Sequence, residues 1–231
     1  VRIALRHMTP VMLLTDGYIA NASELWPIPD LDDYDPSAHW KPDADASGNV
    51  FDRDAETLAR RWAVPGHPSF VHRVGGIEKD IDSGNISYDA DNHQAMTDLR
   101  RDKVKTVADY LPDQELEAGV YGGLAVVAWG STWGSVYQAV QACLNEGLAV
   151  AHIHLRHINP LPANLAALLA QFDSILVPEL NDGQLVTLLR DRVRLDLEQL
   201  NQVNGQPLHV ATLEERIRHL APRRIQEASN E

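Results

Sequence analysis

Polar side chains follow two short apolar runs of this chain, at the places where buried strands would end. The run PVMLLT precedes Asp16 and Gly17, and the run SILVP precedes Glu179, Asn181 and Gln184. Because α/β proteins bind ligands at the carboxyl edge of a parallel sheet, we expect these residues to contact a substrate or a neighbouring subunit. Helix caps and interface salt bridges use the same residue types, so a purely structural role stays open.

A glycine- and serine-rich loop, WGSTWGS at residues 129–135, connects a further predicted strand to a helix. Such a loop can present backbone N–H groups to an anion, which makes Ser131 another candidate contact. The loop lacks the three spaced glycines of a dinucleotide fingerprint and the lysine of a phosphate loop. The sequence favours a tight strand-to-helix turn, with ligand contact as the alternative.

Two histidines, His152 and His154, share one face of a predicted strand within HIHLRHINPLP. Paired histidines can bind a metal, but no acidic or thiolate partner lies at ligand spacing, so histidines hydrogen-bonded within the fold are favoured. The sequence contains no serine–histidine–aspartate arrangement at a recognisable elbow, no cysteine cluster and no isolated carboxylate pair. We therefore expect no catalytic residue and no metal site in this chain.

The second half of the sequence alternates strand-like and helix-like segments. Apolar runs at 124–129, 148–153 and 174–178, with a shorter one at 208–211, are separated by helical patterns. This rhythm predicts a small doubly wound α/β domain with a mostly parallel sheet.

The first half is less regular. The run at 10–15 fits a buried parallel strand, which needs neighbours that must come from the later α/β units or, as we favour, from chain outside this sequence. The acidic stretch 29–56 predicts an ordered, irregular strap. A three- and four-residue apolar spacing predicts a helix over 91–111, capped by Asp91 or Asn92.

Residues 75–104 combine charges of both signs, among them Glu78, His93, Arg100 and Lys103, around a turn at Ser-Gly-Asn. Mixed charges of this kind suggest a docking surface. A solvated helix face with charge pairs inside the helix explains much of the same pattern, so both interpretations remain.

Composition restricts the function classes. Of 231 residues, 20 are basic and 33 acidic, giving a net charge of −13, which disfavours binding to nucleic acid or an anionic membrane. The single cysteine, Cys143, excludes an internal disulfide and is expected to be a buried apolar residue. No run of eighteen apolar residues occurs. With Val1 first, we expect a piece of a longer cytoplasmic protein.

Seven stretches together resemble one known family. They are TPVMLLTDGYIANASELWPIPD, RRWAVPGHP with GGIEKD and NHQAMTDLRRDKV, WGSTWGS, HIHLRHINPLP and VPELNDGQL. Their order and spacing resemble the C-terminal part of the alpha subunit of 2-oxoacid:ferredoxin oxidoreductases, in particular the 2-oxoglutarate type. The resemblance implies the tail of a thiamine-diphosphate pyrimidine-type domain at 1–35, a strap and charged helix at 36–117, and a transketolase C-terminal-like domain at 118–231.

The resemblance also implies an activity: oxidative decarboxylation of a 2-oxoacid to its acyl-CoA with reduction of ferredoxin. Thiamine diphosphate, Mg²⁺ and an iron–sulfur cluster would be bound mainly outside this segment, which would serve domain packing and assembly and be inactive alone. The implied partners are the beta subunit, the N-terminal remainder of the alpha subunit and ferredoxin, in a heterotetramer. Alternatives are the same complex acting on pyruvate or a branched 2-oxoacid, and a stand-alone binding module.

Overall fold

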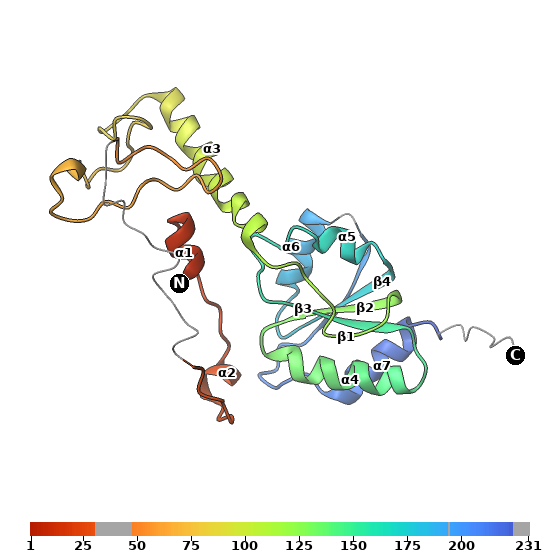
Figure 1. The fold of residues 1–231 in the computed structure, drawn as a ribbon. Helices are drawn as coiled ribbons and strands as arrows, with labels where there is room; N and C mark the ends of the chain where they lie inside the picture. Colours follow the sequence, from red (N-terminus) through yellow and green to blue (C-terminus); the bar gives the residue numbers. More distant parts are fainter. Residues whose placement is uncertain (31–47, 194, 224–231) are drawn as a thin grey trace, which may run out of the picture. The chain divides into compact units, whose positions relative to one another are not determined.

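The computed structural model describes residues 1–30, 48–193 and 195–223. The chain divides into two compact units (Figure 1). The N-terminal unit comprises Val1–Leu13 and Glu24–Leu111, and the sheet unit comprises Leu14–Ser23 and Pro112–Glu231.

The sheet unit is built on five strands in the order β1-β3-β2-β4-β5. The strands are β1 (Ala118–Gly119), β2 (Gly122–Trp129), β3 (Val150–Leu155), β4 (Phe172–Glu179) and β5 (Leu197–Asn201). Only β1 runs antiparallel to its neighbour, and β3, β2, β4 and β5 pair in parallel. The predicted α/β fold with a mostly parallel sheet is confirmed.

Helices cover both faces of this sheet (Figure 1). Helices α4 (Trp133–Asn145) and α7 (Val210–Leu220) pack on one face, and α5 (Leu165–Leu169) and α6 (Gln184–Arg192) on the other. Along β2, Leu124 and Val126 face the first layer, whereas Ala125 and Val127 face the second, and all four are fully buried. A strand buried on both faces reads as a continuous apolar run, which explains why β2, β3 and β4 were predictable.

The prediction for the fourth parallel strand is wrong. Residues 208–211, predicted as a strand, contain the buried Leu208 and the first residues of α7. The strand is instead LEQLN, residues 197–201, whose side chains are mostly exposed. A parallel edge strand has one neighbour and less burial, so it lacks the apolar run that marks its partners.

The predicted strand at 10–15 is also not formed. These residues have no regular secondary structure, and Met12 and Leu13 are 82% and 87% exposed. A strand needs a hydrogen-bonding neighbour, and no described residue supplies one here. A short helix, α2 (Gly17–Asn21), follows.

The N-terminal unit contains α1 (Arg2–His7), a 3₁₀ turn η3 (Pro68–Phe70), the long helix α3 (Ala90–Thr106) and a 3₁₀ turn η4 (Ala108–Tyr110). Its apolar cluster is small: Val50, Phe51 and Phe70, with Ala63 packed against them. Helix α3 confirms the prediction, but Asp89 provides the cap by accepting a hydrogen bond from the Asn92 N–H at 2.8 Å. Most of the predicted acidic strap, 31–47, lies outside the described residues.

Candidate functional site

A buried carboxylate joins the carboxyl ends of β2 and β4. Glu179, the last residue of β4, is fully buried and lies beside Trp129, the last residue of β2. The Trp129 Nε1–H donates to Glu179 Oε1 at 3.3 Å. The backbone N–H groups of Leu185 and Val186 donate to the two carboxylate oxygens at 2.9 and 3.2 Å. Glu179 therefore holds the first turn of α6, whose free N–H groups and dipole favour a negative charge.

The loop after Glu179 continues this arrangement. Asn181 Nδ2 donates to Glu179 Oε1 at 3.1 Å, and Asn181 Oδ1 accepts from the N–H groups of Gly183 and Gln184 at 2.8 and 3.2 Å. The structure thus brings three of the predicted residues together at the sheet edge. The side chain of Gln184 is exposed and makes no hydrogen bond within the described part of the chain.

The remaining predicted residues form a second group. Asp16 caps α2 through the Ile19 N–H at 3.0 Å and also accepts from the backbone N–H and the hydroxyl of Ser131. Burial alone would raise the pKa of Asp16, but the hydrogen bonds from Ile19 and Ser131 outweigh it and lower the pKa. Gly17 opens α2 and its carbonyl accepts from Asn21 Nδ2 at 2.7 Å.

The turn at 130–132 lies between the two groups, because Trp129 contacts Glu179 and Ser131 contacts Asp16. The predicted tight turn is confirmed: β2 passes through a 3₁₀ turn, η5 (Gly130–Thr132), directly into α4. The polar atoms of Glu179 and Asn181 are occupied by protein donors and acceptors. This arrangement positions a loop and a helix. A contact of these residues with a ligand stays a prediction.

The histidines of β3 depart from expectation. His152 is fully buried beside His154, with ring centroids 5.5 Å apart, and near the rings of Trp133 and Tyr137. Neither ring nitrogen of His152 has a hydrogen-bond partner among the described residues. The prediction of hydrogen-bonded histidines is therefore wrong for His152. Burial, with His154 nearby, lowers the pKa of His152 to about 3.

The pKa of His154 is lowered to about 4, again mainly by burial, although the Glu117 carboxylate opposes the shift. A hydrogen bond with the Gly130 backbone also favours the charged form without reversing the effect. Both rings are neutral at physiological pH. Among the described residues, no group of three or more histidine, cysteine, aspartate or glutamate side chains could hold a metal ion.

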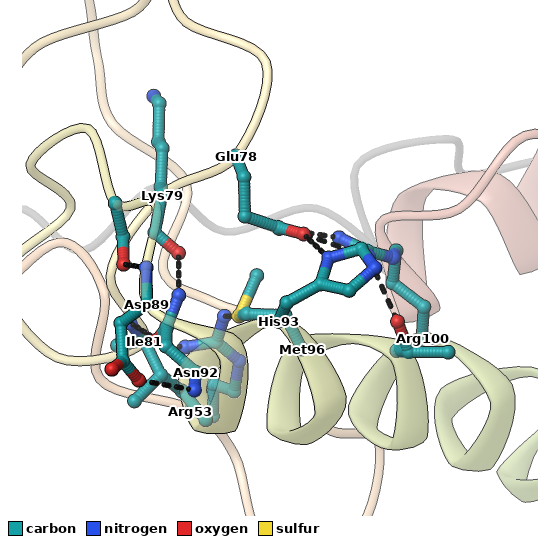
Figure 2. Close-up of polar contacts among 11 residues, drawn as sticks. Arg53, Glu78, Lys79, Ile81, Asp89, Asn92, His93, Met96 and Arg100 are labelled. Atoms are coloured by element: carbon teal, nitrogen blue, oxygen red, sulfur yellow. Dashed lines mark hydrogen bonds and ion pairs between the residues drawn. The ribbon is translucent and has the colours of Figure 1, made fainter.

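A polar network in the N-terminal unit was only partly anticipated (Figure 2). Glu78 accepts a hydrogen bond from Arg100 NH1 at 3.0 Å and pairs with His93 Nδ1 at 2.6 Å. These two bonds lower the pKa of Glu78 to about 2, and the bond from Arg100 contributes most. These pairs join a loop to α3, whereas the pair of Arg101 with Asp98 lies within the helix. Charge pairs within the helix, as the solvated-face interpretation predicts, therefore occur beside charge pairs that join α3 to another segment.

Asn92, predicted from the sequence only as a possible helix cap, instead bridges α3 to a loop. Its Oδ1 accepts from the Ile81 N–H at 2.9 Å and its Nδ2 donates to the Lys79 carbonyl at 3.0 Å (Figure 2). Asparagine in a first helical turn indicates a cap, and nothing in the local sequence distinguishes a cap from a bridge to another loop.

Cys143 is fully buried in α4, as expected, and burial raises its pKa to about 11. None of the described helices is long and apolar enough to span a bilayer.

Known proteins resemble this chain over most of its length. The 2-oxoglutarate oxidoreductase subunit KorA of Mycobacterium tuberculosis is 41% identical over 206 residues, which are 89% of this chain and 31% of that protein. The alpha subunit of 2-oxoacid:ferredoxin oxidoreductase 2 of Aeropyrum pernix is 27% identical over 214 residues, 87% of this chain and 32% of that protein. No protein-family model matches.

A solved structure agrees with the sequence relatives. It is the 2-oxoglutarate:ferredoxin oxidoreductase from Magnetococcus marinus with 2-oxoglutarate, coenzyme A and succinyl-CoA bound. Its TM-score is 0.75 at 26% identity, covering 84% of this chain and 34% of that one. The chain thus spans about a third of the length of these proteins. The family expected from the motifs is confirmed: the chain is homologous to part of the alpha subunits of 2-oxoacid:ferredoxin oxidoreductases.

Proposed function

We propose that this chain is part of the alpha subunit of a 2-oxoglutarate:ferredoxin oxidoreductase. The complete enzyme would convert 2-oxoglutarate, coenzyme A and oxidised ferredoxin to succinyl-CoA, CO₂ and reduced ferredoxin. The observation that carries the proposal is the 41% identity to a 2-oxoglutarate oxidoreductase subunit over 206 residues. The Magnetococcus marinus enzyme, whose structure contains 2-oxoglutarate and succinyl-CoA, supports the same substrate.

The residues of this chain do not fit the inorganic cofactors of such an enzyme. An iron–sulfur cluster needs several thiolates, and the only cysteine is buried in α4 with a raised pKa. The described residues also include no group of three or more histidine, cysteine, aspartate or glutamate side chains that could hold a metal ion. We therefore assign thiamine diphosphate, Mg²⁺ and the cluster to the beta subunit and to other parts of the complex, which supply the redox chemistry.

The role proposed for the chain itself is packing and assembly. Its domains would be the tail of a pyrimidine-type domain (1–35), a strap with a charged helix (36–117), and a transketolase C-terminal-like domain (118–231). Support for the first assignment comes from exposed apolar side chains near residue 10 and residue 25: Met12, Leu13, Leu25, Trp26 and Ile28. Clustered apolar exposure of this kind indicates a surface that other protein covers. We place the complex in the cytoplasm.

Two alternatives remain distinguishable. The same complex could act on pyruvate or a branched 2-oxoacid, since the Aeropyrum pernix relative carries only the broader name 2-oxoacid:ferredoxin oxidoreductase. The chain could also act as a stand-alone binding module through the loop edge formed by residues 130–134 and 181–184. Such a module would be a stable monomer that binds a small anion without a partner.

Purification of the native assembly that contains this chain tests the proposal. Native mass spectrometry should find a particle with a beta subunit. The kcat/KM for ferredoxin reduction should be at least about tenfold higher with 2-oxoglutarate than with pyruvate or 2-oxoisovalerate. Faster turnover of pyruvate would select the alternative substrate. A stable 25.6 kDa monomer with no partner would contradict membership in the complex.

A further inference from the structure

Five cations line one cavity in the N-terminal unit. The cavity has a volume of about 200 Å³, and its cationic lining residues, here called the cationic pocket, are Arg53, Arg60, Lys79, Arg100 and Lys103. Among the described residues, Asp80 is the only carboxylate that lines it, and the other lining residues are Phe51, Met96 and Leu99. Such a concentration of positive charge is unexpected in a chain with a net charge of −13.

Two of the guanidinium groups have buried N–H groups without acceptors. Arg53 NH1 donates to the carbonyls of Phe51 and Ile81 at 2.8 and 3.2 Å, but Arg53 Nε is buried and has no partner among the described residues. Arg60 NH1 is likewise buried without an acceptor in that part of the chain. Neither atom is exposed to the cavity, so these two donors show that the guanidinium groups are partly buried without full compensation by protein acceptors.

The charges of the cationic pocket are also not balanced. Within the described part of the chain, no carboxylate forms an ion pair with Arg53, Arg60, Lys79 or Lys103. Burial, and then the charges of Arg53 and Arg60, lower the pKa of Lys103. The like charges therefore repel one another until an anion enters.

The neighbouring carboxylates are engaged elsewhere. Asp80 Oδ1 accepts from the N–H and the hydroxyl of Ser83, both at 2.7 Å, and so closes its own turn. Glu78 pairs with Arg100 and His93 outside the group of four unpaired cations. Glu78 is therefore engaged outside this group, whereas Asp80, whose pKa the hydrogen bonds from Ser83 lower, stays charged and offsets one positive charge of the pocket.

The framework around the pocket is fixed before any ligand binds. Asn92 ties the loop bearing Lys79 to α3, the helix that carries Lys103, and Glu78 ties the same loop to Arg100 (Figure 2). Arg53 is held by two backbone carbonyls. A preorganised set of donors binds an anion without the cost of ordering those side chains first.

We propose that the cationic pocket binds a phosphate-type oxoanion, such as the phosphate or diphosphate group of a ligand. Four cations without ion pairs, offset among the described lining residues by Asp80 alone, carry more positive charge than one carboxylate ligand would balance, and guanidinium groups match phosphate geometry. A cavity of about 200 Å³ also exceeds the ~30 Å³ that one water occupies. This inference does not rest on the proposed oxidoreductase function.

Isothermal titration of pyrophosphate into the 231-residue chain, and into the complete complex, tests the inference. Lys103→Gln removes a pocket cation whose side chain makes no hydrogen bond within the described residues. The matched control is Lys105→Gln on the same helix, which loses an exposed charge paired with Asp102 at 2.8 Å. We expect Lys103→Gln to weaken pyrophosphate binding roughly tenfold, because one charge-assisted contact is lost, and Lys105→Gln to change it less than about twofold.

The thermal unfolding midpoint in anion-free buffer shows whether the variants fold. Lys103→Gln should unfold at the same temperature as the unmodified chain or higher, because it relieves repulsion, and pyrophosphate should raise its midpoint less. Arg60→Gln gives a second test of binding at the pocket. The proposal is overturned if pyrophosphate does not bind saturably, if Lys103→Gln and Lys105→Gln bind it equally, or if succinate binds as tightly as pyrophosphate.

Discussion

The two units of this chain are stabilised in different ways. In the sheet unit, apolar clusters cover both faces of a five-stranded sheet, and the described residues include only a few buried polar side chains: Thr132, His152, His154 and Glu179. Among the described residues of the N-terminal unit the apolar cluster is three residues with one neighbour, and loops are joined by hydrogen bonds from side chains to the backbone. The first arrangement depends on buried area and the second on individual polar contacts. Substitutions should therefore act differently in the two units.

The largest effect is expected at Glu179, where the sheet unit depends on one polar residue. Glu179→Ala would leave Trp129 Nε1 and the N–H groups of Leu185 and Val186 without their acceptor. At ~1–3 kcal/mol for each buried donor, the free energy of unfolding should fall by about 5 kcal/mol. Urea unfolding measures this change. Glu198→Ala on β5, an exposed residue paired with Arg216, is the control and should cost less than about 1 kcal/mol. Equal effects of the two variants would contradict the role of Glu179.

The second effect concerns pH and again the sheet unit. The folded pKa values of His152 and His154 are about 3 and about 4, against 6.5 in the unfolded chain. As pH falls below 6.5 the unfolded chain binds protons that the folded chain does not, so stability decreases until the folded pKa values are reached. Between pH 7 and pH 5 we expect a loss of about 2 kcal/mol for each histidine, about 4 kcal/mol in total.

Urea unfolding at several pH values checks this prediction. His152→Phe should remove about half of the pH dependence and should not reduce stability at pH 7, because it replaces two unpartnered nitrogens by apolar atoms. His219→Phe, an exposed position on α7, serves as the control and should keep the pH dependence of the unmodified chain. An unchanged pH dependence in His152→Phe would show that the pair is not buried as described.

A third, smaller effect is expected where the N-terminal unit uses its few apolar residues. Gly84 has φ +68°, and a Cβ there would overlap the ring of Phe51. Gly66 has φ +87° with no atom within 4 Å of such a Cβ, so Gly66→Ala reports the backbone strain alone. We expect the free energy of unfolding to fall by about 3 kcal/mol in Gly84→Ala and by about 1 kcal/mol in Gly66→Ala. Hydrogen exchange of the Asp80 amide, which donates to Asn85, measures the local loss. Equal losses would exclude packing of this turn on Phe51.

The same contrast explains what could be predicted from the sequence. Buried parallel strands and α3 leave apolar periodicities, so β2, β3, β4 and that helix were found. The edge strand β5 buries few side chains and leaves no such signal. The run at 10–15 is apolar but does not pair with another described segment, and local composition does not show whether a pairing strand exists.

The candidate site was predictable to a similar extent. Strand ends are visible as the last residue of an apolar run, so Glu179 and Ser131 were found at the sheet edge. Their partners were not, because Trp129 and Asp16 are distant in sequence from the residues they contact. The cationic pocket combines Arg53, Lys79 and Lys103 from irregular loops and a helix. A set of residues without periodicity is recognisable only after folding.

The smallest effect tests whether polar bridges really hold the N-terminal unit. Asn92→Ala removes the bonds to the Ile81 N–H and the Lys79 carbonyl, while alanine slightly favours the helix. The free energy of unfolding of the N-terminal unit should fall by about 2 kcal/mol, and the sheet unit should be unaffected. Gln94→Ala, at an exposed position of the same helix that bonds Asp98, should change stability by less than about 0.5 kcal/mol. Faster hydrogen exchange at Ile81 in Asn92→Ala alone is the expected outcome. Equal exchange in both variants would mean that apolar packing, rather than this bridge, fixes the loop, and the contrast between the units would disappear.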